Sequence, residues 1–523
     1  MPLGANVQDV EARTQGFAEG VNIQDAPNLL APTEVRRAEN GIFDERGGFT
    51  KRLGCQNMGP VGAAGDRIIS TYVFDRGGSP NPPHFMIHTS AGTVYYTTDP
   101  TATTVTWTQI GTGYSTTQPM SWETFNSKVY FCDGASLYSS WDGTTLATYA
   151  SAPKAKYLRL WKDTMWASGV TGLPDRVYAS AAGDAQTWPV AGWLDIRHGD
   201  GDMIRGLATD GTYLIVGKRN SGSVVTDPAN LYNHVFDYEK GIESHWSVIQ
   251  RDADIFYLTR RGVARWQGDA PADIISYKID PVFDPRILNF DRLQFAWGYA
   301  QGQRLSWCLA EVGSVVATMQ INYYPRLAQL SPLGVRGLGP WSFDRIPISC
   351  ATLYRYQSIV RLYGGSTVAN RFYWVFADTA GQDDGVTFTA ILETGAFDFG
   401  QPILTKYVRR MRILGRGRFN VQLLRNFRSD SYANTPVDFT AQATVWNSGN
   451  WNVGDWGPDA SVKEATINPD AYGRFFTLVF SDADPNVGSI SLPVGSKNYA
   501  IPTGQWSILQ TLLDGYLLGV REN

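Results

Sequence analysis

The sequence predicts an all-β protein with a β-propeller-like body, and three observations support this. Aromatic residues make up 13% of the 523 residues, and 53 glycines accompany them; this combination suits short strands joined by tight turns. From about residue 67 to 386, short apolar runs alternate with turns. These runs group into units of roughly 40–50 residues, the spacing expected of propeller blades. A β-sandwich or an irregular multi-sheet body is the alternative.

Asp-Gly pairs between apolar runs are the strongest local hairpin signal. Asp133-Gly134, Asp142-Gly143 and Asp210-Gly211 occupy such positions. They predict hairpins at three places in the body. No strict Trp-Asp repeat is present, because Trp141-Asp142 is a single occurrence.

The first 60 residues are expected to form an extended N-terminal arm and the first strand. Within the segment 20–54, which we call the leader, residues 34–40 predict one or two helical turns, residues 44–48 a turn, and residues 49–53 the start of a strand. The leader has the character of a segment that lies along the main body, closes the propeller, or crosses to a neighbouring subunit.

Residues 61–385 are expected to form the propeller-like body. Two long irregular segments, 220–243 and 320–340, predict projecting loops that narrow a channel or meet a partner. Residues 386–523 predict a separate C-terminal β-sandwich-like domain.

Strands in this C-terminal domain are expected at 387–395, 403–415, 472–480 and 507–518. The strand 403–415 is expected to pair with residues 419–424 as a hairpin across the glycine-rich turn between them.

Small and polar residues of the leader resemble the opening of the tail nozzle proteins of short-tailed bacteriophages, also called tail tube B or tail hub proteins. Related phage "stabilisation" proteins share the pattern. The matching positions are Gly20-Val21-Asn22, Asp25-Ala26-Pro27, Glu34, Asn40, Gly47-Gly48 and Lys51-Arg52-Leu53-Gly54. The C-terminal third is similar to the end of the same family: a strand reading ETGAFDFG, a basic strand, a Trp-rich hairpin and a closing strand before GYLLGVREN.

This resemblance implies a virion structural protein of the tail, made in the cytoplasm of a bacterial host. It implies a homo-oligomeric ring, a hexamer in the family, below a head-to-tail adaptor protein. Such a ring extends the DNA channel, retains the genome, and conducts it at infection. The partners implied are the adaptor, tail fibres or tailspikes, and viral double-stranded DNA in transient contact.

Composition agrees with a body that meets other proteins. Charged residues are 18% of the chain, and interface cores are depleted of charge; a large aromatic core is the other explanation. The net charge of −4 and the pI of about 5.8 are not those of a chain that grips nucleic acid with its whole surface. The four scattered cysteines predict reduced core residues. No long apolar run occurs, so no membrane segment is expected.

A basic run without any acidic residue lies in the C-terminal domain. It predicts contact with an acidic protein surface, a solvated face, or contact with DNA phosphate, and these readings stay open. On an ideal strand Arg410, Arg412, Arg416 and Arg418 share one face, with Arg409 on the other. The candidate contact residues are Lys406, Arg409, Arg410, Arg412, Arg416, Arg418, Arg425 and Arg428.

Three tryptophans spaced by five, Trp446, Trp451 and Trp456, form a small Trp-Asn repeat. The repeat predicts either an aromatic edge that contacts a sugar or a partner, or a plug that caps a sheet.

No catalytic, cofactor-binding or metal-ligating residues are predicted, and no cofactor. His84 and His88 are four apart but have no carboxylate near them, and no HExxH, GxSxG or Walker motif occurs. The protein is therefore expected not to be an enzyme. Two alternatives remain: a stabilisation or stopper protein of a long-tailed phage, and a β-propeller protein that binds or cleaves glycans.

Overall fold

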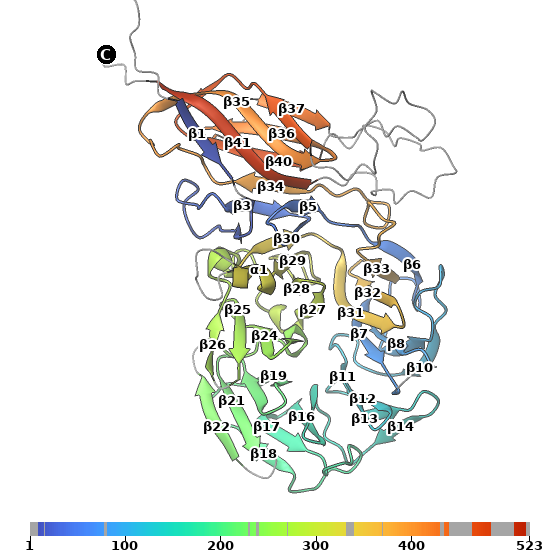
Figure 1. The fold of residues 1–523 in the computed structure, drawn as a ribbon. Coiled ribbons are helices and arrows are strands. Elements are labelled where there is room, and N and C mark those ends of the chain that lie inside the picture. Colours follow the sequence, from blue (N-terminus) through green and yellow to red (C-terminus); the bar gives the residue numbers. More distant parts are fainter. Residues whose placement is uncertain are drawn as a thin grey trace, which may run out of the picture. The chain divides into compact units, whose positions relative to one another are not determined.

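The fold is all-β over the residues that the computed structural model describes, which are 9–14, 16–77, 81–227, 231–236, 240–268, 270–330, 339–368, 370–428, 433–438, 463–482 and 507–518. The chain forms two compact units (Figure 1). The propeller unit is Cys55–Asn322 with Arg345–Ala377. The sandwich unit is Met1–Gly54 with Tyr323–Asp344 and Asp378–Asn523.

Six four-stranded antiparallel sheets and the three neighbouring strands β27, β28 and β29 form the seven blades that the described residues give to the propeller unit (Figure 1). Blade 1 contains β7 (Ile68–Phe74), β8 (His84–Thr89), β9 (Thr93–Thr97) and β10 (Thr108–Thr112); blade 2 contains β11 (Ser121–Phe125), β12 (Lys128–Cys132), β13 (Tyr138–Trp141) and β14 (Leu146–Tyr149); blade 3 contains β15 (Tyr157–Trp161), β16 (Thr164–Val170), β17 (Leu173–Ala179) and β18 (Trp193–Asp195).

The later blades follow the same order. Blade 4 contains β19 (Ile204–Thr209), β20 (Leu214–Lys218), β21 (Gly222–Asp227) and β22 (Leu231–Phe236); blade 5 contains β23 (Ile249–Arg251), β24 (Asp254–Leu258), β25 (Val263–Gln267) and β26 (Ala270–Ile274); blade 6 contains β27 (Trp297–Gln301), β28 (Arg304–Leu309) and β29 (Met319–Tyr323); blade 7 contains β31 (Ile348–Tyr356), β32 (Ile359–Ser366), β33 (Arg371–Val375) and β6 (Gln56–Pro60).

The first strands of the blades lie innermost, around the propeller axis. β11 contacts β15, β15 contacts β19, β27 contacts β31, and β31 contacts β7. In blade 7 the outermost strand is β6, which precedes blade 1 in the sequence and pairs with β33. This pairing joins the start of the propeller unit to its last blade and closes the ring of blades.

The predicted Asp-Gly hairpins are present. Asp142-Gly143 joins β13 to β14, and Asp210-Gly211 joins β19 to β20. At the second turn, Asp210 accepts backbone N–H groups of the next residues, and Gly211 has φ +92°, which favours glycine. Apolar residues of neighbouring blades then pack together, as Met86 of blade 1 does with Phe131 of blade 2.

Two segments that were expected to be long projecting loops contain regular secondary structure. Residues 220–243 contain the hairpin of β21 and β22, which is the outer half of blade 4. Residues 320–340 contain the end of β29 and helix α1 (Pro325–Leu330), while 331–338 lie outside the described residues. The prediction of irregular loops was wrong for the described parts, because the apolar residues of β21 and β22 are interrupted by polar residues, and the pairing of β21 with β20 is not visible in the local sequence.

Two sheets form the sandwich unit (Figure 1). The first has the order β38-β35-β41-β5-β4, with β1 on β41 and β39 on β35; the second has the order β30-β3-β34-β40-β36-β37, with β2 on β3. Their bounds are β1 (Asp9–Arg13), β2 (Gly20–Val21), β3 (Glu34–Glu39), β4 (Gly41–Phe43), β5 (Phe49–Lys51), β30 (Trp341–Asp344), β34 (Ile391–Thr394), β35 (Thr405–Arg416), β36 (Arg418–Arg425), β37 (Ala433–Asp438), β38 (Lys463–Ile467), β39 (Ala471–Gly473), β40 (Phe476–Asp482) and β41 (Ser507–Leu518).

Alternate residues of both sheets are buried, as in two sheets packed face to face. Met411 and Ile413 of β35 are buried from one sheet, and Phe419 and Val421 of β36 from the other. An ion pair links the sheets, because Nζ of Lys51 lies 2.9 Å from a carboxylate oxygen of Asp482.

Two predictions for this unit were wrong. β35 and β36 do not form a hairpin: β35 pairs with β38, β39 and β41, and β36 pairs with β37 and β40. Residues 34–40 do not form helical turns, because β3 pairs with β34 and β2. In both places pairing with strands distant in the sequence overrides the local pattern.

Short 3₁₀ helices complete the fold: η1 (His245–Ser247), η2 (Tyr277–Phe283) and η3 (Leu293–Phe295). Among the described residues, no helix has the length and apolar character that crossing a bilayer requires. All four cysteines are buried and free, as the sequence predicts.

Buried histidines make the stability of blade 1 depend on pH. Burial lowers the pKa of His88 from 6.5 to about 4, and the pKa of His84 in the same direction. Between these values the unfolded chain binds a proton that the folded chain does not, so stability falls as pH drops below 6.5. From pH 7 to pH 5 we expect His88 to remove about 2 kcal/mol.

Hydrogen exchange of the β8 amides, measured in denaturant at pH 7 and at pH 5, reports this loss of stability. His88→Met should flatten the pH dependence, while His198→Gln, at a side chain that is 79% exposed, should leave it unchanged. Equal pH dependence in His88→Met and the wild type would contradict the assignment.

Candidate functional site

The leader is built into the sandwich unit by buried polar contacts. Nδ2 of Asn22 donates to Oε1 of Glu34 at 3.0 Å and to Oδ2 of Asp25 at 2.9 Å. The second oxygen of Glu34 accepts the backbone N–H of Ala31 at 3.0 Å. Asn22, Asp25 and Glu34 are among the spaced small and polar residues of the leader, and their contacts show that this part of the leader encodes a folded turn.

Arg52 is the centre of a second polar cluster, which we call the Arg52 joint. Its side chain is fully buried, and its two terminal nitrogens donate to both oxygens of Asp383, at 2.9 and 2.5 Å. Nε donates to Oδ1 of Asn40 at 3.2 Å, and the guanidinium lies 3.7 Å from the ring centroid of Phe388. Oδ1 of Asp344 is 3.8 Å from Nε. A bidentate pair of this kind fixes orientation as well as charge.

Asn40 and Gly54 hold the leader in place beside the Arg52 joint. Nδ2 of Asn40 donates to the carbonyl of Thr389 at 2.8 Å, and Asn40 has φ +54°, a conformation that asparagine tolerates. At Gly54 a Cβ would lie 2.0 Å from the carbonyl oxygen of Gln382, so only glycine fits. The backbone N–H of Gly54 donates to Ala380 at 2.7 Å.

The leader and the ETGAFDFG segment of the C-terminal domain contact each other. The carbonyl of Pro27 in the leader accepts the N–H of Ala396 in the ETGAFDFG segment at 2.8 Å. A Cβ on Gly395 of that segment would lie 3.0 Å from Cβ of Leu30. The two segments therefore belong to one folded unit.

The basic run divides into three groups. Lys406 is fully buried, and its ammonium donates to the carbonyls of Gln401 and Arg474; burial lowers its pKa. Lys406 therefore lies inside the domain, and the prediction that it contacts a partner is corrected. Arg418 pairs with Asp438 at 2.6 Å, with both side chains substantially exposed.

On β35, Arg410, Arg412 and Arg416 are half-buried and alternate with buried residues, so they share the outward face, as predicted. Arg418 lies in the other sheet and does not extend this row. Arg409 is exposed at a register shift between Val408 and Arg410.

At the end of β36, Nη1 of Arg425 approaches the carbonyl of Tyr472 at 3.5 Å. Arg428 is exposed. Arg425 ends β36 of the second sheet and Arg428 follows it, whereas the outward row lies on β35 of the first sheet. Trp446, Trp451 and Trp456 lie outside the described residues.

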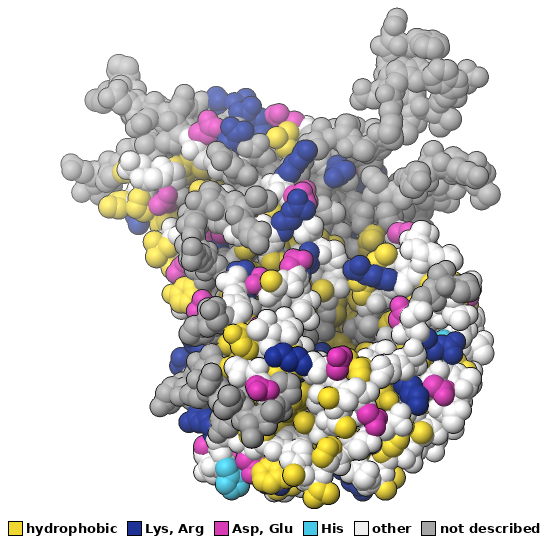
Figure 2. Space-filling model, turned by 60° about the horizontal axis from the view of Figure 1, so that its bottom comes forward, with side chains coloured by type: hydrophobic (Ala, Val, Ile, Leu, Met, Phe, Trp, Pro, Cys, Tyr) yellow, Lys and Arg dark blue, Asp and Glu magenta, His cyan; other side chains and the backbone are white. Residues whose placement is uncertain are grey.

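Side chains of both signs are interspersed on the face of the molecule seen in Figure 2. Within the described residues, no group of three or more His, Cys, Asp or Glu side chains is placed to hold a metal ion.

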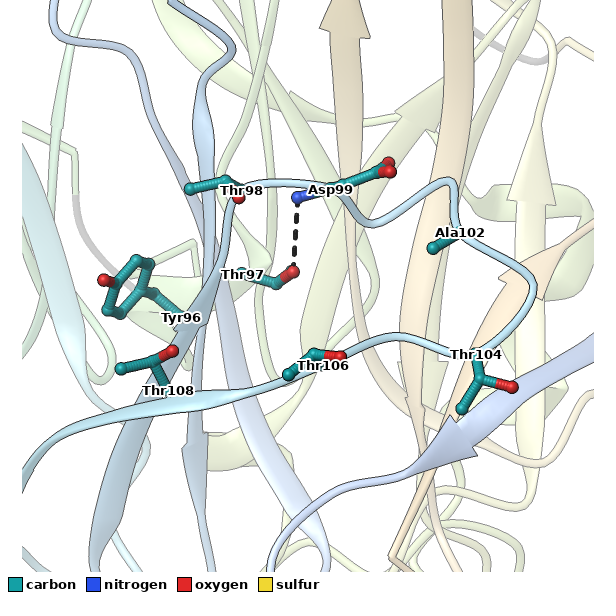
Figure 3. Close-up of a pocket in the computed structure, with 8 residues that line it drawn as sticks. All are labelled: Tyr96, Thr97, Thr98, Asp99, Ala102, Thr104, Thr106 and Thr108. Atoms are coloured by element: carbon teal, nitrogen blue, oxygen red, sulfur yellow. Dashed lines mark hydrogen bonds between the residues drawn. The ribbon is translucent and has the colours of Figure 1, made fainter.

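A polar hollow of about 300 Å³ lies beside the loop between β9 and β10 (Figure 3). Tyr96 and Thr108 stand at one end, and the Thr97 hydroxyl accepts the N–H of Asp99 at 3.2 Å. The lining holds one carboxylate, whereas glycoside hydrolysis uses two. The geometry offers hydrogen bonds to a hydroxylated ligand.

The propeller axis is filled by η1, a feature that the sequence analysis missed. Nε1 of Trp246 donates to the carbonyl of Met120 in the segment before blade 2 at 3.1 Å. Nδ1 of His245 accepts the N–H of Leu207, so Nε2 carries the proton and donates to Ser121 at 3.0 Å. Burial lowers the pKa of His245 well below 6.5, so the ring is neutral. The Glu-Ser-His-Trp-Ser sequence between two blades, with its unusual mixture of polar and aromatic residues, was the available signal.

Comparison with protein-family models and with curated proteins found no match. Among solved structures, the chain is similar to the computationally designed Ika8 protein, at 9% identity and a TM-score of 0.37, over 61% of this chain and 100% of that one. A likeness at this level carries no argument about function.

Proposed function

We propose that the protein is a virion structural protein, a subunit of a phage tail nozzle or hub ring. The observation that supports this best is the meeting of the two segments that resemble the nozzle family. Leader residues Asn22, Asn40 and Arg52 occupy buried, hydrogen-bonded positions in the unit that also contains the ETGAFDFG segment. Residues in such contacts determine how the unit folds. This agrees with a structural role, because a ring subunit acts through its shape and its contacts.

In this proposal the ring extends the DNA channel below the portal and adaptor, retains the genome, and conducts it by steric gating. The filled propeller axis supports a path between subunits, because η1 occupies the axis and a duplex has to pass outside the blades. A heterologous interface closes such a ring by rotation. Fibres or tailspikes would attach to its outer side.

The leader also offers a surface for a neighbouring subunit. Leu29 is 71% exposed at its tip, next to Leu30, which packs inside the unit against Gly395. An exposed leucine costs little in a monomer, but in a ring it can contribute to an interface core.

The native mass of the purified full chain tests the ring. We expect a species near six times 57.8 kDa, and Leu29→Glu should reduce it at least tenfold relative to monomer, because a buried charge opposes association. Val386→Glu, at another exposed apolar residue of the same unit (67% exposed), is the matched control and should assemble normally.

A chain lacking residues 1–54 should remain β-rich but assemble poorly, because β3, β4 and β5 are removed from the two sheets. A strictly monomeric wild type, or an intact ring formed without residues 1–54, would contradict the proposal. A stabilisation or stopper protein of a long-tailed phage shares the same pattern and remains the second candidate; an image of the parent particle separates the two.

A further inference from the structure

Two turns of the sandwich unit meet where the chain crosses from one sheet to the other. β39 pairs with β35 in the first sheet, and β40 pairs with β36 in the second. Oδ1 of Asn426, just after β36, accepts the backbone N–H of Arg474 at 2.8 Å and that of Phe475 at 3.4 Å. The backbone N–H of Asn426 donates to the carbonyl of Phe475 at 2.9 Å. Residues 425–428 and 472–475 therefore form one surface, which we call the edge surface.

Two aromatic rings of the edge surface are half exposed, and each is supported by a second ring. Tyr472 is 51% exposed, and its ring centroid lies 4.7 Å from that of Tyr407 on β35, with 35° between the planes. Phe427 is 51% exposed, and its ring centroid lies 4.7 Å from that of Phe475, with 36° between the planes. One side of each exposed ring is thus covered by its supporting ring, and the other side is open to solvent. Exposed large rings that gather in one place indicate a binding surface.

The two exposed rings are close enough for one short ligand strand. Tyr472 precedes Phe475, the ring that supports Phe427, by three residues, so the Cα atoms of Tyr472 and Phe475 are at most about 11 Å apart. Arg474 lies between these two residues in the chain. The edge surface therefore offers two ring faces with a guanidinium group attached between them.

Further arginines accompany the rings. Arg474 and Arg428 are both exposed. Nη1 of Arg425 approaches the carbonyl of Tyr472 at 3.5 Å. The two turns of the edge surface therefore carry three arginines beside the exposed rings.

The charged groups next to the edge surface leave it positive. The hydroxyl of Tyr407 donates to Asp470 at 2.6 Å; this bond raises the pKa of Tyr407 to about 12, and the charge of nearby Arg409 opposes the rise. Burial lowers the pKa of Lys406, and the carboxylate of Asp398 opposes this change. Among these residues and those of the two turns, four arginines stand against two carboxylates, before Lys406 is counted.

We propose that the edge surface binds single-stranded nucleic acid. The rings of Tyr472 and Phe427 each take the face of an unpaired base, because aromatic side chains stack on bases of any sequence. Arg474 is placed to bind the phosphate that links two such bases, since a planar guanidinium pairs with two phosphate oxygens. A duplex presents its phosphates but keeps its base faces stacked inside, so the exposed rings favour a single strand. The surface lies within the sandwich unit, and the inference does not depend on the ring proposed above.

Fluorescence anisotropy of a short labelled oligothymidylate, titrated with the full chain at constant ionic strength, tests the proposal. The wild type should bind the strand saturably, and more tightly than the duplex that the strand forms with its complement. Tyr472→Ala and Phe427→Ala should each weaken binding about tenfold, the loss expected for one stacked base. Tyr472→Phe should bind as the wild type does, because the ring is retained. Tyr277→Ala, at a tyrosine of the propeller unit that is 52% exposed, is the matched control and should leave binding unchanged.

The arginines are tested in the same titration. Arg474→Gln should weaken binding and reduce its dependence on salt, because one phosphate contact is lost. Arg286→Gln, at an arginine that is 87% exposed and paired with Asp284, should change neither.

Three results would overturn the proposal: a wild type without saturable binding, equal affinity for the strand and its duplex, or Tyr472→Ala and Phe427→Ala variants that bind as the wild type does. Polyglutamate provides the remaining comparison. If it displaces the strand, and if its own binding is lost in Arg474→Gln but kept in both ring variants, the edge surface belongs to an acidic protein partner instead.

Discussion

Replacing Arg52 by glutamine should destabilise the sandwich unit by about 3–5 kcal/mol. The substitution leaves Asp383 buried opposite a neutral group and removes the bonds to Asn40 and to the carbonyl of Leu53. An uncompensated buried carboxylate is among the few single changes with an effect of this size. Hydrogen exchange of β3 and β5 measures it directly, because a chain of two units need not unfold in one step.

Arg326→Gln is the matched control. Arg326 and Glu45 form an ion pair of 2.9 Å in the same unit, with both side chains more than half exposed. Removing an exposed pair should change stability by about 1 kcal/mol or less. Similar losses of protection in Arg52→Gln and Arg326→Gln would show that the Arg52 joint does not hold the leader.

Replacing Trp246 by alanine should destabilise the propeller unit by about 3–5 kcal/mol. The indole is 8% exposed, packs against Tyr157, and bonds to Met120. Its removal opens a cavity on the axis and takes one donor from the Met120 carbonyl, which keeps the hydroxyl of Ser70 as a donor. Exchange of the amides in β11 and β19 should increase together, since both strands contact the filled axis.

Trp193→Ala provides the comparison within the same unit. Trp193 lies on the outer strand β18, is 44% exposed, and covers the guanidinium of Arg176 at 3.6 Å. Its loss should cost about 1 kcal/mol, the range of an exposed cation–π contact. Unchanged exchange at β11 and β19 in Trp246→Ala would mean that η1 is not part of the core.

Local sequence predicted the propeller well where its strands are joined by tight turns. Asp142-Gly143 and Asp210-Gly211 predict their hairpins correctly, because the turn residues and the flanking apolar runs lie within a few residues of each other. The outer strands β21 and β22 were missed for the converse reason. β22 is an edge strand that pairs on one side only, and the two valines of β21, which pairs on both sides, are flanked by glycine and polar residues, as in a loop.

Pairing between strands that are distant in the sequence could not be predicted from local sequence patterns. β1 at residues 9–13 pairs with β41 at residues 507–518, and β3 pairs with β34. β35 and β36 follow each other with one residue between them, yet belong to different sheets. Turn chemistry cannot distinguish a hairpin from a chain that crosses between sheets.

In the candidate site, too, the local sequence predicted some features, while others depend on contacts between distant residues. The leader was marked by its spaced small and polar residues, and these do form buried contacts in the sandwich unit. Asp383, the partner of Arg52, is 331 residues away and sits in a polar turn that gives no local sign of burial. The basic run was visible, but the burial of Lys406 and the division between two sheets follow from tertiary pairing.

A cryo-electron microscopy image of the parent particle tests the proposed function most directly. The proposal predicts a ring of copies of this chain below the portal and adaptor, with the propeller units arranged around a lumen and DNA in that lumen. Copies absent from the tail, or DNA density running along the axis of a single propeller, would contradict it.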